Sequence, residues 1–427
     1  MILTPLPMSS GSNESPGYLD VPELSAVVFP AAYKAGAKVH SNSWKDGVDT
    51  YNSFSYDVDD FSRKNDDFLV FFAAGNYGHY GAKTVKTPSN AKNCLSVGAM
   101  DVRDAYTDEV HAVGTVAYFS SIGPSNDGRM KPDIVTVGHY VLSAFAGPPG
   151  HLSSVLSTSS SSSSTSVQST CAVISSSGTS MSTPIAAGVA LLIRQFYYDS
   201  AFWAATCDTT QSMCAAGAFS PSGYLVKATI LHSGRGLGRY STSDFDYKTA
   251  IDSVALGAPP DEYQGYGAIT LNNVLPLPNG LGLPAPLKLS VWDALVLPEN
   301  KVYKWTISFQ TSSSSSSSTL LSRPIKVTIC WYDPPSKVGS VSNLLIHNLD
   351  LKIMSPSGTV YWGNGKQSAD DVNPNEQITI SDATECEAKD SCVYTVYVSA
   401  GVFAEADQQK FAIVFTTAGM FTTCPLV

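Results

Sequence analysis

The pattern of apolar residues changes at a proline- and glycine-rich stretch, residues 275–286. Before it, helix-length runs alternate with short apolar runs such as DFLVFFAAGN (67–76) and CLSVGAM (94–100). Continuous Leu, Val and Phe in a strand are typical of a parallel sheet that is covered on both faces. The succession of strand, helix and strand therefore predicts an α/β domain with a doubly wound parallel sheet over residues 1–283.

Beyond that stretch the apolar runs have strand length and are separated by turn residues. Examples are KVYKWTISF (301–309) and CVYTVYVSAG (392–401), and no helical period of any length occurs. This pattern predicts a second, all-β domain over residues 284–427, a sandwich of jelly-roll-like type. Two serine tracts, 153–170 and 312–319, bury too little apolar surface to offset their ordering entropy, so we expect surface loops there.

Composition and charge exclude several classes of partner. Only 15% of the residues are charged, the net charge is −10, and no concentrated Lys/Arg segment is visible, which disfavours nucleic acid. No run of 18 apolar residues occurs, so no membrane span is expected. The neutral, Ser/Thr-rich composition is typical of a secreted protein, although residues 1–17 do not have the pattern of a secretion signal.

The eight cysteines have no zinc-ligand spacing. Two pairs bracket short polar loops and predict disulfides, and two further pairs are expected to meet in the fold; free buried thiols are the alternative. The first two pairs are Cys207–Cys214 and Cys386–Cys392, and the other two are Cys94–Cys171 and Cys330–Cys424.

A serine heads an apolar run in SSSGTSMSTPIAAGVALLIRQ, residues 175–195. The run from Met181 to Leu192 is apolar on nearly every face, which predicts a central, buried helix. Ser180 in its first turn lies where unpaired backbone N–H groups and the positive end of the helix dipole favour negative charge. On these residues alone, Ser180 is either a nucleophile or a helix cap.

Seven blocks of the sequence favour a nucleophile over a helix cap as the role of Ser180. GTSMSTP resembles the active-serine motif of subtilisin-like serine proteases, and six other segments follow that family's order. They are VHSNSW, FFAAGN, NCLSVGA, FSSIGPSNDGRMKPDIV, SGYLVKATILHSG and GYGAITL. The second domain also resembles the β-sandwich carried by one branch of the family. The resemblance implies a subtilisin-like domain that lacks its N-terminal part, followed by that sandwich.

The resemblance also implies roles for individual residues. Ser180 is the acylating nucleophile, and Asn76 donates its side-chain amide to the oxyanion together with the backbone N–H of Ser180. Without the resemblance, a simple turn residue after Gly75 is the favoured interpretation of Asn76. The substrate peptide is expected to pair as an added strand with Ser43 and Trp44 on one side and with Ala74 and Gly75 on the other.

Three positions depart from the family pattern. Lys45 stands where a glycine usually follows the tryptophan, and its side chain either crowds the pocket or points to solvent. Ile122 and Val137 also replace the usual residues. These departures leave the cleavage specificity open.

The largest departure concerns the catalytic base. In the family, the aspartate and the histidine of the triad both precede the oxyanion asparagine, but His40 is the only histidine before Asn76 and lies in no matching motif. His79 and His232 are expected to lie on the wrong side of the site or inside a helix. The acidic residues Asp20, Asp46 and Asp49 also match no motif. Because a serine hydroxyl without a base is barely nucleophilic, we expect weak activity from this chain alone.

The chemistry itself requires no cofactor. HNLDL and YWGNG resemble blocks of the family's second domain. Asn348 and Asp350 in this region are candidate oxygen ligands for a structural calcium ion. Asp350 as a simple strand-end or turn partner is the alternative.

Three interpretations therefore stand. The chain is an N-terminally incomplete endopeptidase that acts on protein or peptide substrates in the secretory pathway or outside the cell. Alternatively, it is a non-catalytic peptide-binding protein, or it functions when a separate chain supplies the missing part.

Overall fold

The computed structural model describes most of the chain. The described residues are 20–101, 114–144, 173–201, 203, 217–242, 253–277, 282–284, 287–309, 323–386 and 392–424. Both serine tracts and the expected Cys207–Cys214 pair lie outside these residues.

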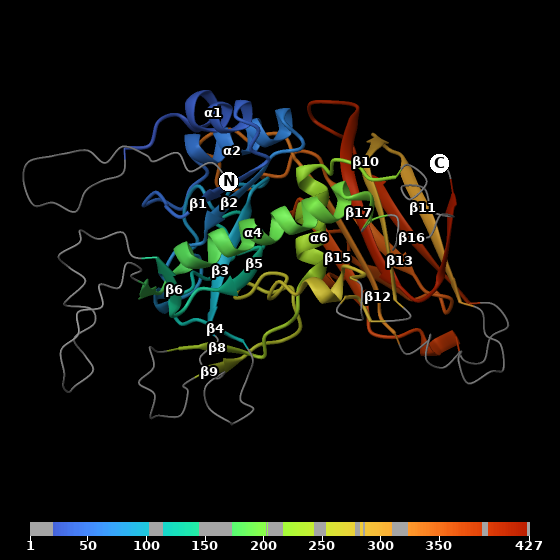
Figure 1. Ribbon diagram of the computed structural model, residues 1–427. Helices are drawn as coiled ribbons and strands as arrows, with labels where there is room; N and C mark the ends of the chain where they lie inside the picture. The colour runs from blue at the N-terminus through green and yellow to red at the C-terminus, as the bar shows by residue number, and fades with distance from the viewer. Residues whose placement is uncertain are drawn as a thin grey trace, which may run out of the picture.

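The first part of the chain is built on a seven-stranded sheet with the order β1-β2-β3-β4-β8-β9, in which β5 also pairs with β3 (Figure 1). The strands β1, β2, β3 and β5 run parallel, whereas β4 is antiparallel to β3 and β9 is antiparallel to β8. The sheet is therefore mixed: the parallel strands that the sequence predicts are present, and β4 and β9 add antiparallel pairs. A separate hairpin joins β6 to β7. The bounds are β1 Val39–Asn42, β2 Leu69–Ala73, β3 Leu95–Asp101, β4 Thr115–Val116, β5 Ile134–Val137, β6 Val141–Ala144, β7 Val173–Ser176, β8 Arg239–Ser241 and β9 Ser253–Ala255.

Helices cover both faces of this sheet. Successive side chains of β2 point to opposite faces of the sheet. Leu69 and Phe71 pack with α4 and α6, whereas Val70 and Phe72 pack with α1 and α2. The helices are η1 Leu24–Val28, α1 Phe29–Lys34, α2 Ser53–Lys64, α4 Thr179–Tyr198 and α6 Gly223–Ser233, with one-turn helices η2 Gly78–Tyr80, η6 Leu271–Asn273, η8 Gly363–Gly365 and η9 Thr384–Cys386.

Helix α4 departs from the expectation of a helix that is buried on every side. Its inner face, with Ala186, Ala190 and Ile193, is buried in the core. Its outer face leaves Leu191 43% and Leu192 55% exposed. Within the described residues β1 is the last strand on this side of the sheet, so nothing there covers the outer face of α4 beyond it.

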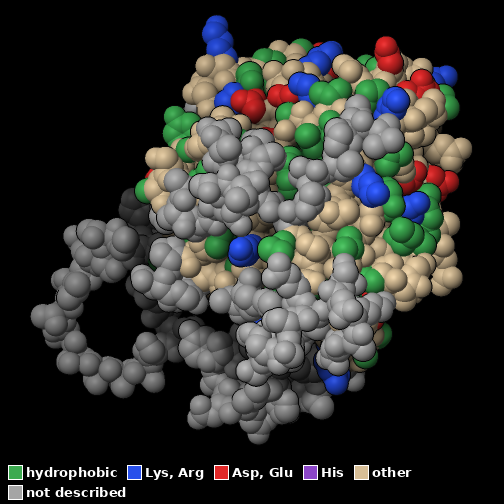
Figure 2. Space-filling view, turned by 90° about the vertical axis from the view of Figure 1, so that its right-hand side faces the viewer, with side chains coloured by type: hydrophobic (Ala, Val, Ile, Leu, Met, Phe, Trp, Pro, Cys, Tyr) green, Lys and Arg blue, Asp and Glu red, His purple; other side chains and the backbone are tan. Residues whose placement is uncertain are grey.

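The second part of the chain is a sandwich of two antiparallel sheets, as the strand-length runs predict. A four-stranded sheet has the order β10-β17-β12-β15, and a five-stranded sheet has the order β14-β13-β16-β11-β18. The jelly-roll form stays a prediction. On the described part of the outer face, hydrophobic and charged side chains are interspersed (Figure 2). The bounds are β10 Lys288–Pro298, β11 Val302–Phe309, β12 Ile325–Trp331, β13 Leu349–Met354, β14 Val360–Trp362, β15 Asn375–Ile380, β16 Cys392–Ala400, β17 Gln408–Thr417 and β18 Met420–Cys424.

The cysteines follow the expectation only in part. Cys386 and Cys392 form a disulfide, which confirms that pair. Cys94 is a free, buried thiol that donates to backbone carbonyls such as that of Ala91, so the Cys94–Cys171 pair is wrong. Cys330 is also free and buried. Its side chain packs in the apolar cluster around α6 rather than between the two sheets of the sandwich, so the Cys330–Cys424 pair is wrong as well.

Helix α6 joins the two parts of the molecule. It lies between the α/β sheet and the strands β12 and β17 (Figure 1), and one continuous apolar cluster runs from Phe71 through Leu225 to Val414. The fully buried His232 of α6 has its ring nitrogens 2.9 Å from the hydroxyls of Thr328 and Thr416. The sandwich is therefore part of the same core as α4, the helix that carries Ser180.

A buried lysine links the two parts at this junction. The Lys92 ammonium is fully buried and donates to the carboxylate of Asp333 at 2.6 Å, to the Ser336 hydroxyl at 2.7 Å and to the Leu344 carbonyl at 2.6 Å. Removing one member of a buried ion pair leaves an uncompensated charge, which typically costs about 3–5 kcal/mol.

We predict that Lys92→Met lowers the midpoint temperature of unfolding substantially, with a loss of about 3–5 kcal/mol. Lys64→Met is the matched control, because Lys64 is exposed and pairs with Asp60 in α2, where a surface ion pair contributes at most about 1 kcal/mol. Thermal unfolding of both variants is the measurement. Equal midpoints would contradict the junction described above.

Candidate active site

Ser180 is the second residue of α4. The helix follows Gly178, whose φ of 150° is a backbone conformation that residues other than glycine rarely adopt. The first N–H groups of a helix have no intrahelical acceptor, so this position favours a bound anion. The Ser180 side chain is half-buried and lines a pocket. The helix start that the sequence predicts is therefore present, and it opens onto a cavity.

Thr179 ties the loop after β2 to this helix start. Its backbone N–H and its hydroxyl both donate to Oδ1 of Asn76 at 2.9 Å, and its hydroxyl accepts from the N–H of Gly75 at 3.2 Å. Because two donors hold Oδ1, the amide group Nδ2 of Asn76 is the end that stays free to donate. A Cβ on Gly178 would come 3.1 Å from Nδ2, so the glycine leaves room for the amide.

The pocket at this junction has a volume of about 300 Å³. Its lining brings together the predicted residues Ser43, Trp44, Gly75, Asn76 and Ser180. Ala74 is fully buried instead, and its N–H donates to the carbonyl of Val97. The remaining lining residues are Lys45, Ala73, Tyr77 and Thr179.

Among the described residues, the hydroxyl of Ser180 is paired with a backbone carbonyl and not with a base. It donates to the backbone carbonyl of Ser43 at 3.3 Å, and the Ser43 hydroxyl donates back to the carbonyl of Ser180 at 2.8 Å. In the part of the chain that the structure describes, no histidine nitrogen lies within hydrogen-bonding distance of Ser180 Oγ. A carbonyl cannot take the proton, so this arrangement holds the alcohol without activating it.

The histidines considered from the sequence lie elsewhere. His40 is in β1, where its Nδ1 is buried without a partner and burial lowers its pKa to about 4. His79 packs on the ring of Tyr80 at 4.1 Å. Burial also lowers the pKa of His232, which is held between two threonines of the sandwich. A general base works best with a pKa near the working pH, so neither buried imidazole is suited to that task.

Sequence reasoning missed a second polar pair near the carboxyl ends of the strands. His139 Nδ1 lies 2.9 Å from the carboxylate of Asp101, and the His139 ring stacks on Tyr140 at 4.3 Å. The sequence contained a signal for this pair. Asp101 ends β3 and His139 lies just beyond β5, and these two strands are parallel neighbours. His139 makes no hydrogen bond to Ser180.

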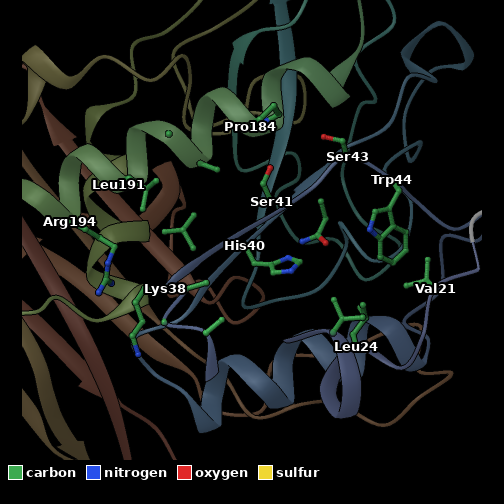
Figure 3. Close-up of a pocket in the computed structure, with 18 residues that line it drawn as sticks. Val21, Leu24, Lys38, His40, Ser41, Ser43, Trp44, Pro184, Leu191 and Arg194 are labelled. Atoms are coloured by element: carbon green, nitrogen blue, oxygen red, sulfur yellow. The ribbon is translucent and has the colours of Figure 1, made fainter. Parts of the chain in front are cut away.

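A larger cavity of about 510 Å³ lies along the open edge of β1 (Figure 3). His40 points from β1 toward Leu24, whereas Pro184 and Leu191 of α4 border the other side (Figure 3). Ser43 lines both this cavity and the pocket beside Ser180. Among the described residues the outer edge of β1 is unpaired, and a free strand edge has backbone N–H and C=O groups that can pair with another segment.

The sandwich contains oxygen atoms that lack partners. Asn348 donates from Nδ2 to Asp350 at 3.0 Å, but Oδ1 of Asn348 is buried without a partner. The fully buried Glu376 accepts from the N–H of Leu351 with one oxygen, whereas Oε1 has no partner. Burial raises the pKa of the Glu376 carboxyl well above its usual value, and Asp350 and Asp370 raise it further. Among the described residues, no group of three or more His, Cys, Asp or Glu side chains is arranged to hold a metal ion.

The described residues contain no helix with the length and apolar character of a membrane span.

The chain is similar to several known proteins. The chain is 25% identical to the serine protease/ABC transporter B family protein tagD of Dictyostelium discoideum over an alignment of 491 residues. The alignment covers 92% of this chain and 26% of tagD. The serine protease/ABC transporter B family protein tagB of the same organism is 27% identical. That alignment covers 96% of this chain and 25% of tagB. Serine protease AprX of Bacillus subtilis strain 168 is 35% identical over 127 residues, which is 30% of this chain and 26% of AprX.

The chain spans about a quarter of the length of these relatives. The family model described as the subtilase family matches residues 6–267, which is more than half of the chain and includes Ser43, Asn76 and Ser180. This protein therefore belongs to the subtilase family of serine peptidases.

Proposed function

We propose that this chain is the nucleophile-bearing part of a subtilisin-type endopeptidase, in which Ser180 forms an acyl-enzyme with the carbonyl of a peptide bond. One observation carries the proposal. Thr179 holds Oδ1 of Asn76 with two hydrogen bonds, so the amide of Asn76 and the hydroxyl of Ser180 border the same pocket.

This geometry supports stabilisation of a tetrahedral intermediate. Attack by Ser180 Oγ places negative charge on the former carbonyl oxygen, and an amide donor already held in place needs no reorganisation at that moment. The N–H groups at the start of α4 and its dipole act on the same oxygen. Loss of one such side-chain donor typically lowers the rate about 100- to 1000-fold.

The residues described here supply no base. In subtilisin, loss of the histidine alone lowers kcat about a millionfold, and the remaining site still accelerates the reaction about 1000-fold or more over water. We therefore propose that the described residues by themselves are a weak catalyst, and that a polypeptide segment bound at the open edge of β1 carries the base. The shared position of Ser43 in both cavities supports this location.

A non-catalytic peptide-binding protein is the second candidate. The same pocket and the same main chain at Ser43 serve a bound peptide whether or not it is cleaved. The half-buried hydroxyl of Ser180, which donates to a carbonyl, favours this function as long as no base is supplied.

Chemical rescue distinguishes the two candidates. We predict slow labelling of the purified chain by a fluorophosphonate, and faster labelling when imidazole is added as an external base, because imidazole takes the proton that no described residue near Ser180 accepts. Ser180→Ala abolishes the imidazole-dependent labelling, and Asn76→Ala reduces it about 100- to 1000-fold. Mass spectrometry of the labelled peptide is the measurement.

Ser177→Ala is the matched control, because Ser177 precedes α4 and is absent from the lining of the pocket. Its labelling is expected to equal that of the unaltered chain. Labelling that does not depend on imidazole and that persists in Ser180→Ala would favour the peptide-binding protein. Rapid labelling of Ser180 without imidazole would contradict the weak activity of this chain.

We also propose that Asn348, Asp350 and Glu376 hold a structural calcium ion, because calcium prefers oxygen ligands and two of these side chains have a buried oxygen without a partner. Extracellular location is a further proposal, which the disulfide between Cys386 and Cys392 supports. Protein or peptide chains are the proposed substrates.

The calcium proposal predicts that calcium raises the midpoint temperature of unfolding, and that Glu376→Gln removes this effect by withdrawing a charged ligand. Glu405→Gln is the control, because Glu405 is exposed on the surface. Thermal unfolding with calcium and with a chelator is the measurement. An unchanged calcium effect in Glu376→Gln would refute this site.

A further inference from the structure

We propose that Lys45 makes the pocket beside Ser180 selective for glutamate or aspartate, at the substrate residue whose carbonyl is attacked. This inference rests on the proposed function, and it names the substrate class of the same site. The sequence left Lys45 either crowding the pocket or pointing to solvent, and the structure offers a third role for it.

The position of Lys45 is the first observation. Lys45 is half-buried and belongs to the lining of the 300 Å³ pocket, together with Asn76 and Ser180. Its ammonium nitrogen lies 4.5 Å from the centre of the Tyr77 ring, and Tyr77 lines the same pocket. The charge is therefore held over the pocket wall by a cation–π contact.

The second observation is that no described carboxylate compensates the charge of Lys45. No carboxylate of the described residues lies within ion-pair distance of its ammonium group. The adjacent Asp46 is directed elsewhere, since its oxygens accept from the N–H of Gly47 at 2.6 Å and from the amide of Asn52 at 3.0 Å. Asp49 lies 3.7 Å from Lys86.

The rest of the lining is neutral. Apart from Lys45, the pocket is formed by serine, threonine, alanine, glycine, asparagine, tryptophan and tyrosine, so no lining residue carries a negative charge. A partly enclosed site with one uncompensated cation attracts an anion and repels a cation. A lysine also has a flexible stem, so its ammonium can move from the Tyr77 ring to a carboxylate that enters the pocket.

The size of the effect follows from the burial. A hydrogen bond to a charged group in a partly buried site corresponds to a preference of about 10- to 100-fold over a neutral side chain of the same shape. Glutamine is the neutral match for glutamate, so the comparison of these two residues isolates the charge. Because the pocket is open to solvent, added salt weakens the preference.

Peptide aldehydes provide the test. The hydroxyl of Ser180 adds across the aldehyde C=O group, its proton passes to the former carbonyl oxygen, and the terminal side chain occupies the pocket. We would measure the binding of fluorescein-labelled peptide aldehydes that end in Glu, Gln, Leu or Lys by fluorescence anisotropy, using the 427-residue chain.

The expected result is binding of the glutamate aldehyde about 10- to 100-fold tighter than the glutamine aldehyde. Lys45→Gln removes this preference, and Lys45→Glu shifts it to the lysine aldehyde. Lys34→Gln is the matched control, because Lys34 is exposed on α1 and is absent from the pocket. Its preference is expected to equal that of the unaltered chain.

The outcomes separate this inference from the proposed function. Equal binding of the Glu, Gln and Leu aldehydes, or a preference for Leu, with dependence on Ser180 retained, overturns the role of Lys45 alone. A glutamate preference that survives in Ser180→Ala with unchanged affinity overturns the acyl-enzyme and supports Lys45. Failure of every aldehyde to bind overturns both.

Discussion

The site depends on one small set of hydrogen bonds, those of Thr179. The hydroxyl of Thr179 accepts from Gly75 and donates to Asn76, while its N–H donates to the same amide oxygen. These bonds join the end of β2 to the start of α4, two segments that are about a hundred residues apart in the sequence. They fix which end of the Asn76 amide is free to donate, and with it the direction in which the site can stabilise charge.

The surrounding fold makes this arrangement rigid. Helix α4 packs its inner face on the parallel strands, and α6 packs beside it and against the sandwich. The buried ammonium of Lys92 and the imidazole of His232 satisfy polar groups where the two parts meet. The sandwich therefore supports the sheet from one side, whereas the edge at β1 on the other side is unpaired in the described chain.

The sequence predicted the elements whose information is local. The helix at Ser180, the strand before Asn76 and the short strands of the sandwich all follow from apolar runs and their flanking residues. The Cys386–Cys392 disulfide was predictable because its loop is short. The pairing of Lys92 with Asp333 was not, because it joins residues 241 positions apart. The exposed face of α4 was not predictable either, since burial depends on neighbouring strands rather than on the helix itself.

The wrong cysteine pairs have the same cause. Cys330 and Cys424 are both in strands, but nothing in the sequence shows that the Cys330 side chain packs toward α6. The role of Lys45 was also hidden, because a single lysine after a tryptophan does not reveal that its charge lies over Tyr77. Long-range packing and the compensation of charge are properties of the folded molecule.

A crystal structure of the chain bearing a phosphonyl group on Ser180 would test the central claim most directly. The account predicts that the phosphonyl oxygen accepts a hydrogen bond from Nδ2 of Asn76, and that Ser180 Oγ has no imidazole beside it. An oxygen directed away from Asn76 would contradict the account. So would any of the seven histidines of the chain with a ring nitrogen against Ser180 Oγ.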